Sequence, residues 1–185
     1  MNRYVAGWAF GMLLLVACIV ALAGWAPAKP EARGAAAAAD VARLAALADG
    51  VVAGDGRLWV VTARTPDGML RWSGDDAAEA ARWIEETATS AGDSTLWFVN
   101  VQGKLSADAT IADVGPRIEA VADASLIEAY EDGGTTFSYA YDAPAFETTV
   151  GEGDGAISLQ TAAHLDTESG EWRVTLGTPV VMMEY

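Results

Sequence analysis

The sequence predicts an α+β domain that is built around an antiparallel sheet. Segments with helical spacing and segments rich in β-branched and aromatic residues are mostly grouped along the chain and do not alternate strictly. The turns between neighbouring strand segments are short, as in β-hairpins. Hydrophobic residues make up 52% of the chain, which is enough for a packed core.

Three segments carry the spacing of amphipathic helices. They are residues 35–49, 77–91 and 113–123. The first opens with five alanines, which have the highest helix propensity, and places Val41 and Leu44 on one face. Asp76 precedes the second and is a residue type that caps helix N-termini. We expect the third to begin no earlier than about Ala112, because Pro116 is tolerated only in a first turn.

Seven segments have the composition of strands. They are residues 58–63, 69–72, 95–105, 125–131, 135–141, 157–165 and 172–180. Residues 65–68 contain Pro, Asp and Gly, which favour a tight turn between the first two strands. Each half of the chain thus contains a helix followed by a hairpin, which leaves an internal duplication open.

The segment 135–141 predicts a strand with two unlike faces. Phe137, Tyr139 and Tyr141 alternate with small residues, and side chains two apart lie on the same face of a strand. We expect this strand to be half-exposed, so its aromatic face is a candidate binding surface. The other candidate is His164, the only histidine of the chain, in the strand 157–165.

The N-terminus carries an uncharged run from Tyr4 to Ala28 that is preceded by Arg3. As a helix this run would be roughly 37 Å long, more than the roughly 30 Å of a bilayer core. We therefore divide the chain into a signal peptide or signal-anchor transmembrane helix (1–28), a linker (29–34) and the α+β domain (35–185). The domain is expected outside the cytoplasm, membrane-anchored or secreted.

The fate of the N-terminal segment is open among three alternatives. Its length favours an uncleaved anchor that holds the chain in the membrane, whereas Ala26-Pro27-Ala28 has the small residues of a signal-peptidase site. The third alternative is a lipoprotein modified at Cys18, but the residues after Cys18 remain apolar where lipoproteins usually continue with a polar linker.

The charge of the chain argues against nucleic acid as a partner. The formal net charge is −15, and the part that follows Arg33 contains 25 acidic and 8 basic residues. Nucleic-acid affinity comes mainly from basic side chains that neutralise phosphates. The acidic residues are scattered, as on a solvated surface. A calcium-binding surface or a surface for a cationic partner is the alternative.

No catalytic residue, cofactor or metal site is predicted. A single histidine and a single cysteine supply neither a catalytic triad nor a zinc site. The loop 151–155 reads GEGDG, but it has no lysine and opens no helix, so it does not fit a phosphate-binding loop. It also lacks the ligand spacing of a calcium loop, and we expect a turn.

Adjacent carboxylates leave a hydrolase open as the alternative function. They occur as Asp75-Asp76 and Glu85-Glu86. Glycosidases use two carboxyl groups across a cleft that often contains aromatic residues. The domain supplies several tryptophans, which are Trp59, Trp72, Trp83, Trp97 and Trp172. Helix capping and solvated helix faces explain the acidic pairs more simply.

The C-terminal sequence EWRVTLGTPVVMMEY, residues 171–185, resembles the ending of the YwmB family of exported Gram-positive proteins. The segments GAISLQTAAHL (155–165) and IEAYEDGGTTFSYAYDAP (127–144) are similar to its preceding strand and middle hairpin, although His164-Leu165 replaces the usual Arg-Tyr pair. The resemblance implies a fold like that of TATA-box-binding protein, with a curved antiparallel sheet and helices on one side. It implies no activity.

We therefore expect a non-enzymatic, extracytoplasmic domain of the cell envelope. Its partner would be an envelope protein, a peptide or a cell-wall component, bound on an exposed sheet face. The alternative is a wall-active hydrolase that uses paired carboxylates. Two carboxylates that face each other across an aromatic cleft, about 5–10 Å apart, would favour the hydrolase.

Overall fold

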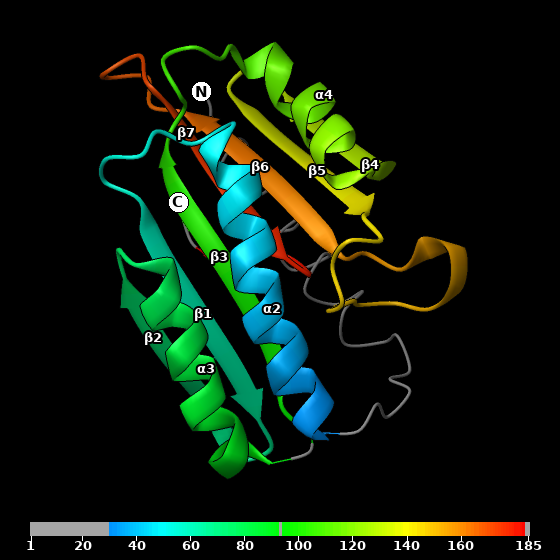
Figure 1. The fold of residues 1–185 in the computed structure, drawn as a ribbon. Coiled ribbons are helices and arrows are strands. Elements are labelled where there is room, and N and C mark those ends of the chain that lie inside the picture. The colour runs from blue at the N-terminus through cyan, green and yellow to red at the C-terminus, as the bar shows by residue number, and fades with distance from the viewer. Residues whose placement is uncertain (1–29, 93, 184–185) are drawn as a thin grey trace, which may run out of the picture.

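Seven strands form one antiparallel sheet in the computed structural model, which describes residues 30–92 and 94–183. The strands are β1 (Leu58–Thr65), β2 (Gly68–Gly74), β3 (Leu96–Lys104), β4 (Ser125–Asp132), β5 (Thr136–Asp142), β6 (Leu159–Leu165) and β7 (Trp172–Thr178). The helices are α2 (Pro30–Asp49), α3 (Ala77–Ala91) and α4 (Ile111–Ala122), with a short 3₁₀ turn η1 (Gly153–Gly155). The strand order is β2-β1-β3-β7-β6-β5-β4, so β2 and β4 form the two edges (Figure 1).

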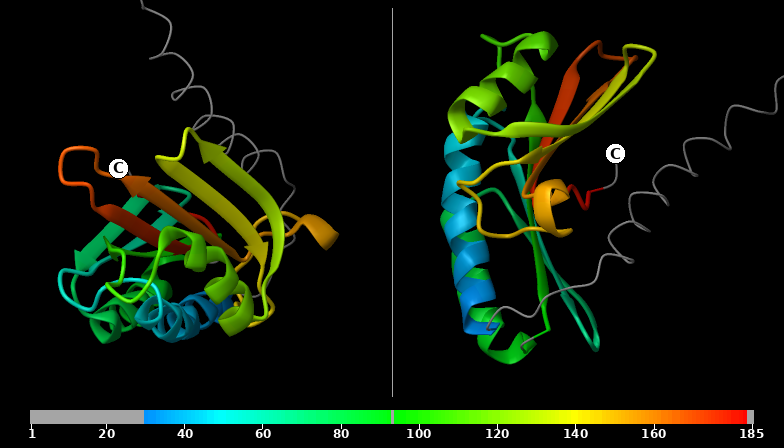
Figure 2. Two further views of the ribbon diagram at one scale, coloured as in Figure 1. Left: turned by 90° about the horizontal axis from the view of Figure 1, so that it is seen from above. Right: turned by 90° about the vertical axis from the view of Figure 1, so that its right-hand side faces the viewer.

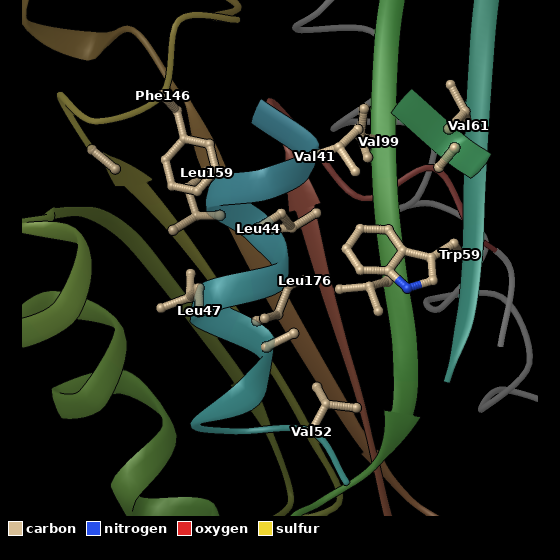
Figure 3. Close-up of a cluster of buried hydrophobic side chains, with 14 of the residues drawn as sticks. Val41, Leu44, Leu47, Val52, Trp59, Val61, Val99, Phe146, Leu159 and Leu176 are labelled. Atoms are coloured by element: carbon tan, nitrogen blue, oxygen red, sulfur yellow. The ribbon is translucent and has the colours of Figure 1, made fainter. Parts of the chain in front are cut away.

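The three helices lie on one face of the sheet (Figure 2). Helix α2 crosses the middle of the sheet, α3 runs along β1 and β2, and α4 lies at the end that carries β4 and β5 (Figure 1). Beneath α2, Val41 and Leu44 meet Trp59, Val99 and Leu176 of the sheet in the main core (Figure 3). The fold class predicted from the sequence, α+β with an antiparallel sheet, is confirmed.

Local signals in the sequence account for most element boundaries. Asp76 caps α3 by accepting a 2.9 Å hydrogen bond from the backbone N–H of Glu79. Thr65 pairs with Gly68, so Pro66 and Asp67 form the two-residue turn of the first hairpin. Helix α2 begins at Pro30 and takes in residues that were expected to form a linker. The predicted signal or anchor segment, residues 1–28, lies outside the described residues.

Helix α4 starts earlier than the proline rule predicts. The helix begins at Ile111, close to the expected start at about Ala112, but the expectation that Pro116 lies in the first turn is wrong, because Pro116 is the sixth residue. The start is fixed by Asp113, whose carboxylate accepts hydrogen bonds from the N–H and the hydroxyl of Thr110 at 2.8 and 2.7 Å. Proline is therefore accommodated in the second turn of this helix, next to Gly115.

A buried carboxylate ties α2 to the connection between β5 and β6. Asp40 accepts hydrogen bonds from the backbone N–H groups of Glu147 and Thr148 at 3.0 and 2.9 Å, and from the Thr148 hydroxyl. Its remaining partner is Arg43, at 2.7 Å. Each oxygen of this buried carboxylate therefore has a donor, as a buried charge requires.

The face of the sheet opposite the helices is partly covered by the end of the chain (Figure 2). The sequence predicts a last strand that runs to Val180, but β7 ends at Thr178 and the chain then turns across this face. Val180 packs against Phe98 and Val150 in a second, smaller core. The backbone N–H groups of Val181 and Met182 donate to the side-chain oxygens of Gln160 and Asn100, each at 2.9 Å.

None of the helices that the structure describes is both long enough and apolar enough to cross a membrane.

Candidate functional site

A groove of about 400 Å³ lies between α4 and the β4–β5 hairpin. Helix α4 contributes Ile111, Gly115 and Glu119 to its lining, among others. The hairpin contributes Leu126 and Glu131 of β4 together with Phe137, Tyr139 and Tyr141 of β5. Figure 2 shows that the tip of the β4–β5 hairpin diverges from α4.

Alternation along β5 builds the aromatic floor of this groove. Phe137, Tyr139 and Tyr141 point to the same side of the sheet, and their ring centroids follow one another at 6.3 and 6.5 Å. Trp172 of β7 continues the row, with its ring centroid 5.3 Å from that of Phe137. The predicted aromatic face of this strand is therefore present, but it faces α4 and not the open side of the sheet.

The three aromatic residues differ in exposure along the groove. Phe137 and Tyr139 are half-buried, whereas 0% of the surface of Tyr141 is exposed. A side chain at Gly115 would begin 3.5 Å from the Tyr141 hydroxyl, which places that hydroxyl beneath the helix. Tyr141 thus forms the closed end of the groove, and Phe137 lies toward the open end.

Two carboxylates line the groove beside the tyrosines. Glu131 accepts a 2.8 Å hydrogen bond from the Tyr139 hydroxyl. Burial and this carboxylate raise the pKa of Tyr139 to about 12. Burial also raises the pKa of Tyr141, with smaller contributions from the charge of Glu119 and from Tyr139. Both phenols therefore keep their protons to a higher pH than an ordinary tyrosine does, next to two acidic side chains.

His164 does not belong to this groove. It pairs with Thr136, and its Nδ1 lies 3.2 Å from the Thr136 hydroxyl oxygen on the opposite face of the sheet. Tyr139 and Tyr141 alternate with residues of that face, so the sheet separates them from the imidazole. Of the four candidate residues, the structure brings together Phe137, Tyr139 and Tyr141 and leaves His164 apart.

The other features noted in the sequence have structural roles. Asp76 is a helix cap, and Glu85 and Glu86 lie exposed on α3. The loop 151–155 forms a turn in which Gly151 and Gly153 have φ values of 89° and 65°. Among the tryptophans, Trp59 and Trp97 are buried in the core. The acidic pairs predicted as hydrolase candidates do not line the groove, whereas Glu119 and Glu131 do.

Glu119 and Glu131 line the groove, but they were not among the residues predicted from the sequence. A signal for Glu131 is present, because a tight turn at residues 132–134 sets it opposite Phe137 in the hairpin. No comparable signal exists for Glu119, since its position over the hairpin depends on how α4 packs. Metal ligands do not gather here or elsewhere in the described part of the chain, where no three His, Cys, Asp or Glu side chains cluster.

Comparisons with protein-family models, with curated proteins and with solved structures found no match for this chain. Membership of the YwmB family stays a prediction.

Proposed function

We propose that this chain is a non-enzymatic binding domain of the bacterial cell envelope that acts outside the cytoplasm. The uncharged N-terminal run supports export, and it would tether the domain to the membrane if it is not cleaved. The ligand would be an envelope protein, a peptide or a cell-wall component. A nucleic-acid partner is disfavoured by the net charge of −15.

The observation that carries this proposal is the groove between α4 and the β4–β5 hairpin. Three aromatic side chains from one strand line it, and ligand sites are typically concave, largely apolar and marked by a few polar groups. The exposed sheet face that the sequence led us to expect is replaced in this proposal by a groove on the helical face.

We also infer that the fold is related to that of TATA-box-binding protein, as the YwmB resemblance implies. The antiparallel sheet with three helices is compatible with that relation. An internal duplication is compatible with the α-helix that precedes each of the hairpins β1–β2 and β4–β5, although the first hairpin is followed by an α-helix and the second only by the short 3₁₀ turn η1 before the next described strand. Similarity of fold would not carry a DNA-binding function to this acidic chain.

Site-specific crosslinking tests the binding role. A photo-crosslinking amino acid replaces Leu126, which lines the groove and is 49% exposed, in the full-length chain. The matched control replaces Met69, which is 69% exposed on the opposite edge strand β2. The proposal expects one envelope protein or wall fragment to be attached at Leu126 and absent at Met69. Equal attachment at both positions, or attachment at neither, would contradict it.

A wall-active hydrolase is the second candidate, because Glu119 and Glu131 both line an aromatic groove. In that case one carboxyl group would protonate the leaving group and the other would act as base or nucleophile. The test is the release of soluble fragments from purified cell walls by the full-length chain. Release that is lost in both Glu119→Gln and Glu131→Gln supports the hydrolase, and no release by the unaltered chain removes it.

A further inference from the structure

The groove has the electrostatic character of a site for a cation. Glu119 and Glu131 line it, and none of the described residues that line it is basic. Helix α4 has one basic residue, Arg117. Its guanidinium group donates hydrogen bonds to the backbone carbonyls of Gly50 and Asp108, at 2.7 and 3.0 Å, and Arg117 does not line the groove. A cation over a tyrosine or phenylalanine ring is further stabilised by the electron density of the ring face.

Tyr141 closes the inner end of the groove with its ring. Its side chain lines the groove but has 0% of its surface exposed, so its hydroxyl is not within reach of a ligand in this structure. The groups that a ligand can reach are the carboxylates of Glu119 and Glu131 and the half-buried rings of Phe137 and Tyr139.

The rim of the groove is an edge strand. Among the described strands only β5 pairs with β4, so one side of β4 has backbone groups that no described strand satisfies. Strand β4 carries Glu128, Glu131 and Asp132 and no basic residue. Unpaired edges accept an added strand from a peptide, and alternate side chains of that peptide then face one side of the sheet.

We propose that the groove and the adjoining edge of β4 bind an extended protein segment with lysine or arginine side chains, in a mode that adds a strand to the sheet. The segment pairs with β4, and its cationic side chains reach the carboxylates of Glu119 and Glu131 over the rings of Phe137 and Tyr139. The inference rests on the proposed binding function and names the class of ligand.

A metal ion and an amino sugar fit these observations less well. Calcium takes six or more oxygen ligands, whereas only two carboxylates line the groove. An amino sugar would use the charge and the rings of the groove but not the backbone edge of β4.

The test measures binding of a synthetic peptide in which lysine alternates with threonine, with the full-length chain in a non-ionic detergent. A peptide with glutamate in place of lysine is the charge control. We expect the lysine peptide alone to bind, and its affinity to fall as ionic strength rises from about 0.01 M to about 1 M, where the screening length shortens from about 30 Å to about 3 Å. Binding of the glutamate peptide with equal affinity would overturn the proposal.

Variants of the chain locate the site. The double variant Glu119→Gln, Glu131→Gln is expected to weaken binding of the lysine peptide by about tenfold or more, because it removes both charges at the groove. The matched control is Glu85→Gln, Glu86→Gln on α3, which loses the same charge far from the groove. An equal loss in that control would show charge attraction without a site and would overturn the proposal.

Methylation of the peptide backbone tests the added strand. Two lysine peptides are methylated on alternate amide nitrogens, one in each of the two registers. Only one register can turn its N–H groups toward β4, so we expect one methylated peptide to lose binding and the other to retain it. Retention by both would overturn strand addition. A lysine peptide that fails to bind, while Leu126 still crosslinks to an envelope component, would refute the cationic ligand and leave the binding function standing.

Discussion

The hydroxyl of Tyr139 donates a 2.8 Å hydrogen bond to the carboxylate of Glu131, diagonally across the β4–β5 hairpin. This contact joins the acidic edge strand to the aromatic floor of the groove. It also places a phenol beside a negative charge in a half-buried position, and the ionisation of Tyr139 therefore reports on the groove.

Replacement of Glu131 by glutamine should lower the pKa of Tyr139. The value of about 12 should fall but stay above the ordinary value of 10.0, because burial, the larger cause of the shift, remains. The measurement is a titration of the phenolate by ultraviolet absorbance, with Tyr139→Phe to assign the signal. Glu128→Gln is the matched control, since Glu128 pairs with Ala140 on the other face. An equal shift in the control would contradict the assignment.

The raised pKa of Tyr139 makes the free energy of unfolding depend on pH. Tyr139 binds its proton more tightly in the folded chain than in the unfolded chain, where the pKa is 10.0. Its contribution to the free energy of unfolding is therefore complete below pH 10 and is lost as the pH rises through about 12. Urea unfolding across this range should show a smaller loss of stability for Tyr139→Phe than for the unaltered chain. Identical losses would refute the prediction.

Loss of the Asp40 carboxylate should destabilise the fold strongly. Asp40→Ala leaves Arg43 without one partner and leaves the N–H groups of Glu147 and Thr148 without an acceptor. The expected decrease in the free energy of unfolding is about 2–5 kcal/mol, because two backbone N–H groups lose their acceptor at about 1–3 kcal/mol each. The control is Glu147→Ala, which removes only the exposed ion pair with Arg43 and should cost less than about 1 kcal/mol. Urea unfolding measures both, and similar costs would contradict the anchoring role.

Gly34 should resist substitution although it lies in a helix. A Cβ atom at this position would lie 2.5 Å from the Cβ of Ala88, so Gly34→Ala forces α2 and α3 apart. The cost of overpacking, about 1–3 kcal/mol, outweighs the gain of about 1 kcal/mol in helix propensity. Thermal unfolding should show a lower midpoint for Gly34→Ala, with a smaller effect when Ala88→Gly is present. A stabilised single variant would refute the close contact.

The C-terminal segment should contribute to stability through Val180 and not through Met182. Val180 is 3% exposed and packs against Phe98, whereas Met182 is 41% exposed. Val180→Ala should cost about 1.5–2 kcal/mol, the value of two buried methyl groups. Met182→Ala should change the stability by less than about 0.5 kcal/mol. Equal effects in urea unfolding would mean that this segment does not pack on the sheet as described.

Local signals were sufficient to predict most elements of the fold. Asp76 marked the start of α3, and the turn at residues 65–68 fixed the first hairpin, because capping and turn chemistry act within a few residues. Alternation along residues 135–141 correctly placed Phe137, Tyr139 and Tyr141 on one face. The place of Pro116 was missed, because the hydrogen bonds between Thr110 and Asp113 start α4 at Ile111 and put this proline in the second turn.

The sequence by itself determined the α+β class, most of the strands and helices, and the aromatic face of β5, since each follows from short-range spacing. Only the tertiary structure decided that this face lies beneath α4, that Glu119 and Glu131 line the same groove, and that His164 is separated from it. It also decided that the chain after Thr178 crosses the opposite face of the sheet. These relations depend on contacts between residues far apart in the chain, and periodicity along the sequence carries no information about which element packs on which face.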